Sequence, residues 1–208
     1  MVTLLTGFEP FGGSTTNPSW DAVTELAARR TVATAQLPCT FTGSLAVLRA
    51  AIAEHSPDLV VCVGQAGGRA AITPERIAVN IRDARIPDNA GDQPIDIPVV
   101  DSGPAAYFTT LPVKAAVARI ASAGIEASVS HTAGTYVCNN VFYGLMHLLA
   151  TEMPHVRGGF VHVPFSPEQG HTDKPSMPVS TIATGLGLLV DACLDTTADL
   201  HISTGTLH

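Results

Sequence analysis

The sequence contains little charge and few aromatic side chains. Charged residues make up 14% of the 208 residues and aromatic residues 5%, with a single tryptophan, whereas 46% are hydrophobic. This balance is typical of a folded globular core and argues against a disordered chain. The net charge is −7, and there is no basic stripe. An acidic chain of this kind suits neither nucleic acid nor an anionic membrane surface, so we expect no partner of either class.

Long apolar runs and paired cysteines are also missing. No stretch approaches the roughly 18 apolar residues of a membrane-spanning helix, and the start, Met1–Phe11, lacks the basic residues that open a secretory leader. The cysteines form no C-x-x-C pair and are too scattered for a disulfide scaffold. They are Cys39, Cys62, Cys138 and Cys193. We therefore expect a cytoplasmic protein with free thiols and no membrane partner.

Short apolar runs alternate with helical patterns along the chain. The expected strands are Val2–Thr6, Val32–Leu37, Leu59–Val63, Arg76–Arg82, Ala127–Ser130 and Phe160–Val163. Expected helices follow caps at Asn17 and Ser44 and cover Pro112–Ala123, Cys138–Glu152 and Thr181–Leu194. The segment Asp83–Pro104 is rich in Pro, Gly, Asp and Asn, which predicts a long loop that is either functional or disordered. A functional loop there would be an interface, a lid or both.

This alternation places the chain in the α/β class. It predicts an α/β/α sandwich, in which helices cover both faces of a twisted, mostly parallel sheet. No internal repeat, linker or low-complexity tract divides the sequence. We therefore expect a single domain over residues 1–208.

Cofactor and metal motifs are incomplete. The segment Gly7–Gly13 has the glycine spacing of a phosphate loop, but Gly13 stands where that loop needs a lysine. Gly185 and Gly187 lack the third glycine of a dinucleotide fingerprint, and the eight histidines include no H-E-x-x-H. The sequence therefore predicts no metal and no cofactor.

Cys138 follows a predicted strand and turn and opens a predicted helix. A thiol at that position lies at the positive end of the helix dipole, which lowers its pKa and favours the thiolate. The free N–H groups of the first helical turn also suit an oxyanion. A free cysteine is more often a small buried hydrophobic residue. The pattern alone leaves both interpretations open for Cys138 and favours the buried one for the other three cysteines.

Two further residues could serve such a thiol. His162 ends an apolar strand, where the sites of α/β sheets collect, and it could take up and return a proton. A hydrogen-bonded core histidine is the plainer interpretation. Glu75 shares the apolar face of Ile77 and needs a partner there. It either pairs with Arg76, Arg82 or another cation, or it orients a histidine.

Six segments occur in an order that carries a family resemblance. They are Gly7–Gly13, Val63–Arg69, Pro74–Asn80, Asp83–Asn89, Ser130–Asn139 and Gly159–Pro164. Together they resemble pyroglutamyl peptidase I, also called pyrrolidone carboxyl peptidase, a family of cysteine peptidases. The resemblance covers about Val2–Met177. It implies an α/β/α sandwich assembled as a homotetramer without a metal, and an omega peptidase that hydrolyses the amide bond after an N-terminal pyroglutamyl residue of peptides.

The resemblance also implies the catalytic roles. Cys138 attacks the pyroglutamyl carbonyl and forms a thioester, His162 acts as base and then as acid, and Glu75 orients His162. These roles repeat the general arrangement of nucleophile, base and orienting group.

The substrate is a small uncharged lactam ring, which favours a flat apolar pocket with a few polar groups. Phe8 and Phe11 match family positions that flank the ring, and both could instead pack beneath the first loop. Gln65 ends a strand, where its amide could reach the ring or the scissile carbonyl. We also expect Val137 to line the pocket wall, and Arg85 to hold the oxyanion or close the site.

Two other functions remain open. One is a cysteine amidase that acts on other acyl groups, against which Phe8, Phe11 and Gln65 argue. The other is a ligand-binding module that has lost catalysis. The intact set of Glu75, Cys138 and His162 disfavours it.

Overall fold

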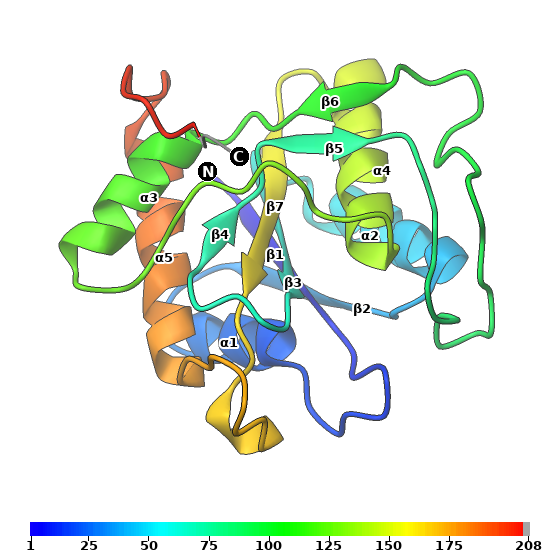
Figure 1. Ribbon diagram of the computed structural model, residues 1–208. Coiled ribbons are helices and arrows are strands. Elements are labelled where there is room, and N and C mark those ends of the chain that lie inside the picture. Colours follow the sequence, from blue (N-terminus) through cyan, green and yellow to red (C-terminus); the bar gives the residue numbers. More distant parts are fainter. Residues whose placement is uncertain (206–208) are drawn as a thin grey trace.

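The computed structural model describes residues 1–205, and a five-stranded sheet lies at its centre (Figure 1). The strand order is β2-β1-β3-β7-β4. The bounds are Thr3–Phe8 for β1, Ala33–Leu37 for β2, Leu59–Gln65 for β3, Thr73–Pro74 for β4 and Arg157–Val163 for β7. All neighbours run parallel except β4, which is antiparallel to β7. The predicted mostly parallel sheet is therefore confirmed.

A second, two-stranded sheet lies beside helix α4 (Val137–Thr151). Its strands, β5 (Ile77–Val79) and β6 (Ala106–Phe108), pair antiparallel. The Asn139 side chain fastens this sheet to the helix, because it accepts a hydrogen bond from the Val79 N–H at 3.1 Å and donates one to the Val79 carbonyl at 2.9 Å. The start of α4 is thereby tied to the segment that directly follows Glu75.

Helices cover both faces of the central sheet, as predicted (Figure 1). One face packs against α2 (Phe41–His55) and α4, through alternate strand residues such as Leu4, Val60 and Phe160. The other face packs against three helices through the intervening residues of the same strands. These helices are α1 (Pro18–Ala27), α3 (Val113–Ser122) and α5 (Val179–Asp195). Because successive strand side chains point to opposite faces, residue parity decides which helical layer each one meets.

Several predicted boundaries are confirmed by the local chemistry. Asn17 caps α1, since its Oδ1 accepts from the Ser19 N–H at 3.1 Å, and Pro18 stands at the first helical position. The predicted helices over Pro112–Ala123, Cys138–Glu152 and Thr181–Leu194 correspond to α3, α4 and α5. The described residues 83–104 contain no helix or strand, apart from an isolated bridge at Ile97, so the long loop is confirmed as a loop.

Three elements differ from the prediction. Helix α2 is capped by Thr40, not Ser44, because the Thr40 hydroxyl accepts from the Gly43 N–H at 3.1 Å and Ser44 is buried within the first turn. The alternating run Arg76–Arg82 shortens to β5, outside the central sheet. The segment Ala127–Ser130 forms only isolated bridges, to Ile72 and Glu75, since its partner strand β4 is two residues long.

The end of the described chain folds back over α3 and β5. Helix α3 lacks a side-chain cap of its own at Pro112. Asp199 supplies one from the tail, because its carboxylate accepts from the backbone N–H groups of Lys114 at 3.1 Å and Ala115 at 2.9 Å. Farther along, the Thr204 hydroxyl accepts from the Arg76 guanidinium at 2.7 Å. The predicted single domain ends at residue 208, and residues 206–208 lie outside the described residues. No helix in residues 1–205 is both long enough and apolar enough to cross a bilayer.

Removing this tail cap tests its contribution to stability. We expect Asp199→Ala to lower the free energy of unfolding by about 1 kcal/mol, because two N–H groups at the start of α3 lose their acceptor. Urea unfolding followed by circular dichroism measures the change. Asp173→Ala, at another exposed aspartate, is the matched control and should behave like wild type. Equal stabilities of the two variants would contradict the capping role.

Candidate active site

Cys138 lies in the first turn of α4, above the central sheet. It is the second residue of the helix and is partly exposed, whereas the other three cysteines are buried and all four are free. A Cβ atom built on Gly64, near the end of β3, would come within 2.9 Å of the Cys138 Sγ and 2.7 Å of the Phe160 Cζ. Only a glycine at this position leaves room for the thiol and the ring.

His162 lies on the strand next to this glycine. In the parallel pairing of β3 and β7, Gly64 and His162 are register partners. Partners in adjacent strands present their side chains on the same face, so the imidazole of His162 projects toward the layer that holds Cys138. Phe160, two residues earlier on β7, shares that face, and its ring centroid is 4.9 Å from that of His162. The sheet register thus brings the thiol and the imidazole to one face.

Glu75 is fully buried, directly after β4. Its Oε1 is 2.7 Å from His162 Nδ1. Its backbone N–H donates to the Phe160 carbonyl at 2.9 Å, and a bridge pairs it with Ser130 on the other side. Because the backbone of Glu75 is held from two sides, the carboxylate has a fixed position against the imidazole. The alternatives left open by the sequence, pairing with a cation and orienting a histidine, both occur.

The cation is Arg69, to which the sequence analysis assigned no role. Arg69 lies in the turn after β3, and one of its guanidinium nitrogens is 2.7 Å from both Glu75 Oε1 and Thr73 Oγ1. Arg76 and Arg82, the two cations that the sequence offered, bind Thr204 and Asn140 instead. A signal for Arg69 was present in the segment Val63–Arg69, which carried part of the family resemblance.

Burial and charge set the proton affinities of these groups. Burial raises the pKa of the Cys138 thiol, and the neighbouring Cys39 and Glu75 raise it further. This direction is opposite to the lowering expected from the helix dipole. Burial lowers the pKa of His162 although the Glu75 carboxylate opposes it. Burial opposes ionisation of Glu75 as well, yet the contacts with His162 and Arg69 bring its pKa below the ordinary value. A neutral thiol, a neutral imidazole and a carboxylate result.

The start of α4 offers backbone donors beside the thiol. The first intrahelical bond in this turn is donated by the Asn140 N–H to the Tyr136 carbonyl, and Tyr136 makes no side-chain cap. The N–H groups of the first turn lack intrahelical acceptors, as at every helix start. A negative oxygen formed next to Cys138 would meet these donors and the positive end of the helix dipole.

A family profile described as pyroglutamyl peptidase matches residues 1–196. The chain belongs to the pyroglutamyl peptidase family. It is 56% identical to a pyrrolidone-carboxylate peptidase of Streptomyces coelicolor, over 99% of this chain and 98% of that protein. The resemblance found in the sequence is therefore confirmed, as is the prediction that the chain is an enzyme of the pyroglutamyl peptidase class.

Solved structures from this family share the fold. The pyroglutamyl peptidase I of Bacillus amyloliquefaciens superposes with a TM-score of 0.93 at 48% identity, covering 97% of this chain and 98% of that one. A mutant pyrrolidone carboxyl peptidase from the hyperthermophile Pyrococcus furiosus gives a TM-score of 0.88 at 38% identity, over 94% and 99% of the two chains. The α/β/α prediction is confirmed.

The residues predicted to bind substrate occupy different surroundings. Phe11 and Arg85 line a hollow of about 270 Å³ at the start of α4, together with Tyr136 and Ile86. The Phe11 and Tyr136 rings are 6.3 Å apart between centroids. This family member therefore has a mainly apolar hollow close to the candidate nucleophile.

Phe8, Val137 and Gln65 lie elsewhere. Phe8 on β1 and Val137, the first residue of α4, are buried in the core between the sheet and α4, and Phe8 packs near Phe160. Gln65 has the strand parity of the opposite face, and its Oε1 accepts a hydrogen bond from Gln169 at 2.8 Å. Their roles toward substrate stay predictions. Residues 1–205 contain no group of three or more His, Cys, Asp or Glu side chains placed to hold a metal ion.

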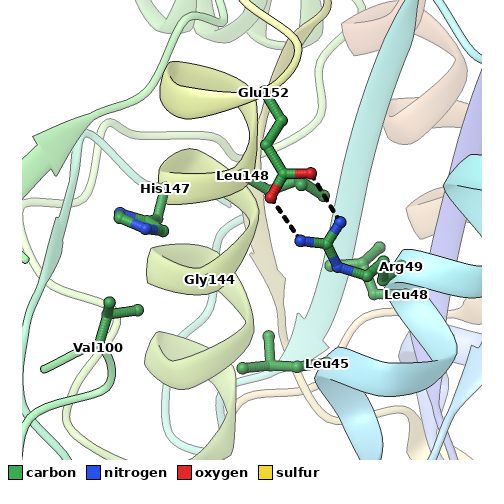
Figure 2. A pocket seen from close by; sticks show the side chains of 8 residues that line it. All are labelled: Leu45, Leu48, Arg49, Val100, Gly144, His147, Leu148 and Glu152. Atoms are coloured by element: carbon green, nitrogen blue, oxygen red, sulfur yellow. Dashed lines mark hydrogen bonds and ion pairs between the residues drawn. The ribbon is translucent and has the colours of Figure 1, made fainter.

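A separate groove runs between α2 and the far end of α4 (Figure 2). It has a volume of about 150 Å³, and an ion pair between Arg49 and Glu152, with one N···O distance of 2.8 Å, crosses its rim. Gly144, the lining residue of α4 nearest to Cys138 in sequence, is six positions farther along the helix, which is about 9 Å of helix rise. The groove is therefore not part of the site around the thiol.

The space above Gly64 generates a packing prediction. We expect Gly64→Ala to lower the free energy of unfolding by about 1–3 kcal/mol, because the added methyl group must displace either the Phe160 ring or the Cys138 thiol. Thermal and urea unfolding measure this change. Gly187→Ala is the control, since its Cβ would meet only the flexible end of Leu26 at 3.3 Å. Stability equal to wild type in Gly64→Ala would show that the packing there is loose.

The proton affinities of the buried pair predict sensitivity to acid. Both Glu75 and His162 have lowered pKa values in the folded chain. As the pH falls, the unfolded chain therefore binds more protons than the folded chain does, and the free energy of unfolding decreases. The His162 part is lost from about pH 6.5 downward and the Glu75 part from about pH 4.3 downward, toward the folded pKa values.

Unfolding in urea at about pH 7.5 and about pH 5.5 isolates the histidine part. His162→Gln should lose less stability between these two conditions than wild type does. His155→Gln, at an exposed histidine, should lose as much as wild type. If His162→Gln lost as much stability as wild type between the two pH values, His162 would not be the group responsible for the acid sensitivity.

Proposed function

We propose that this chain hydrolyses the amide bond after the N-terminal pyroglutamyl residue of peptides, with Cys138 as nucleophile, His162 as base and acid, and Glu75 as the group that orients His162. One observation carries the assignment. The Cys138 thiol packs against Gly64, which is the register partner of His162, and the imidazole of His162 contacts the buried Glu75 carboxylate through Nδ1. Membership of the pyroglutamyl peptidase family supplies the substrate class.

The first half-reaction forms a thioester. Cys138 Sγ attacks the pyroglutamyl carbonyl carbon, while His162 Nε2 takes the thiol proton. This transfer matters because burial keeps the thiol protonated, so the base must act as the S–C bond forms. The carbonyl oxygen becomes negative and meets the first-turn N–H groups of α4. When the C–N bond breaks, His162 returns its proton to the leaving amine.

The second half-reaction releases pyroglutamate. His162 Nε2 removes a proton from water, the resulting hydroxide adds to the thioester carbonyl, and the C–S bond breaks. The thiol then regains a proton from His162, and the resting state is restored. Throughout, Glu75 accepts a hydrogen bond from Nδ1–H, which keeps Nε2 free for both transfers.

The hollow beside α4 supports recognition of a small lactam. Phe11 and Tyr136 offer aromatic surface, and Arg85 lines the same hollow, where it closes the site or assists the oxyanion. Phe8 and Val137 belong to the buried core cluster against which Phe11 and Tyr136 pack, and they support the site from there. Gln65 stays a predicted donor or acceptor for the ring, although its side chain faces the other layer of the sheet, where it accepts a hydrogen bond from Gln169.

The proposal also covers the setting of the enzyme. We assign it to the cytoplasm, where its four free cysteines remain reduced, and to a homotetramer that needs neither metal nor cofactor. Apolar side chains exposed at Ile95 and Phe108, 70% and 69% accessible, are consistent with further assembly. Light scattering of the purified chain tests the tetramer.

Release of a reporter amine from a pyroglutamyl amide under reducing conditions tests the reaction. We expect wild type to turn over and Cys138→Ala to lose activity by a factor on the order of 10⁴ or more, because the nucleophile is gone. Cys193→Ala, which removes a buried thiol in α5, should retain activity. Iodoacetamide should abolish turnover, with the label mapped to Cys138.

The same assay separates the competing functions. Equal rates on unrelated acyl amides would favour a general cysteine amidase over a pyroglutamyl peptidase. Binding of pyroglutamate by a folded, reduced chain that shows no turnover would favour a binding module. Full activity in Cys138→Ala would overturn the assignment of the nucleophile.

A further inference from the structure

Arg69 connects three segments that meet around the buried carboxylate. One guanidinium nitrogen contacts Thr73 Oγ1 and Glu75 Oε1, each at 2.7 Å. A second nitrogen donates to the Thr132 carbonyl at 3.0 Å. Thr132 begins the turn that leads into α4 and Cys138. The side chain therefore spans from β4 and the Glu75 carboxylate to the segment that precedes α4 and Cys138.

We propose that Arg69 is a positioning residue for catalysis, which holds Glu75 ionised against His162 and fixes the turn before Cys138. The inference rests on the function proposed above and adds a fourth member to its machinery. Arg69 does not touch the reacting atoms. It acts through the carboxylate and through the backbone of the turn.

The buried charge of Glu75 needs a compensating group. Glu75 is 0% exposed, and both of its hydrogen-bond partners meet at Oε1, since Oε2 has no partner within residues 1–205. A buried carboxylate is costly unless a charge or several donors compensate it. Among the groups that lower the pKa of Glu75, His162 comes first through its hydrogen bond, but burial lowers the pKa of the imidazole itself, so its positive charge is not permanent. Arg69 is the cation in contact with Glu75, and its side chain is only 30% exposed.

The shape of the Arg69 guanidinium fits the acceptors around it. A guanidinium presents donors in a rigid planar fork, so it can hold several acceptors in one fixed arrangement. A lysine carries the same charge as a single point and cannot span Glu75, Thr73 and the Thr132 carbonyl in the same way. The arrangement at Arg69 uses the fork, because two of its nitrogens bind acceptors on separate segments.

A consequence for the nucleophile can be measured without any substrate. Arg69 favours the anionic forms of Cys138 and Glu75 and disfavours protonation of His162, so its removal raises the pKa of all three groups. Other titratable groups near the thiol stay in place when Arg69 is replaced. They are Cys39, Cys62 and Tyr136.

Three variants test the proposal. Arg69→Met removes the charge and keeps the length, Arg69→Lys keeps the charge, and Arg119→Met is the control. Arg119 pairs with Asp195 at 2.8 Å and is 36% exposed, so its removal breaks a similar ion pair far along α3 and α5. Each variant is assayed for kcat and KM on the pyroglutamyl reporter, for thermal stability, and for the rate of Cys138 alkylation as a function of pH.

We expect Arg69→Met to lower kcat by about 10–100-fold, the usual effect of removing an outer partner that orients a reacting group, with KM changed by less than about threefold. Its alkylation profile should move to higher pH, because less thiolate is present at each pH. Arg69→Lys should recover part of kcat and most of the alkylation shift. Arg119→Met should match wild type in kcat and in its alkylation profile.

Several outcomes would overturn the proposal. Arg69→Met with wild-type kcat and an unmoved alkylation profile, but a lower melting temperature, would reduce Arg69 to a structural residue. A raised KM at unchanged kcat would make it a substrate contact instead. If wild type fails to hydrolyse the reporter, the proposed function falls, whereas the alkylation profile still decides whether Arg69 controls the thiol.

Discussion

The burial of one carboxylate constrains the architecture of the whole site. An ionised Glu75 without contact to solvent is stable only if the chain brings donors to it from elsewhere. The fold does so from two directions, with His162 on β7 and Arg69 from the turn after β3. The backbone of Glu75 is also locked between Phe160 and Ser130. Displacement of β4, β7 or this turn would leave the charge unpaired, so stability and the geometry of the site are coupled.

The same coupling explains the proton chemistry. Burial makes the resting thiol and imidazole neutral and keeps the negative charge on Glu75. An imidazole that faces a fixed carboxylate becomes a better base at the moment a thiol must lose its proton, since the imidazolium then formed is stabilised. The proposed mechanism therefore does not need a permanent thiolate. It needs a fixed arrangement in which proton transfer and attack occur together, and the pairing of Gly64 with His162 favours such an arrangement.

The central sheet and most helices could be predicted because their signals are local. Buried strands such as β3 and β7 are short apolar runs, and Asn17 followed by proline marks a helix start without tertiary information. The elements that were wrongly predicted depend on partners that are distant in the sequence. Ala127–Ser130 has a strand-like composition, but its extent is limited by a two-residue β4. Within the candidate site, the sequence singled out Cys138, His162 and Glu75, and it did not predict the contact of Arg69 with Glu75, because loop conformation decides which arginine reaches a buried acid.

Parity along the strands settles a further question that residue types alone leave open. Gly64 and Gln65 are adjacent, yet they face opposite layers, so one lies under the thiol and the other meets Gln169. A glycine at the first position leaves room for Cys138 Sγ, and a larger residue would have to displace the thiol or the Phe160 ring. The proposed nucleophile Cys138, base His162 and carboxylate Glu75 come from three separate parts of the chain, and none of them is near another in sequence. Their meeting depends on strand register and on one missing side chain, which is why a change at Gly64 would disturb the site as directly as a change in the reacting groups.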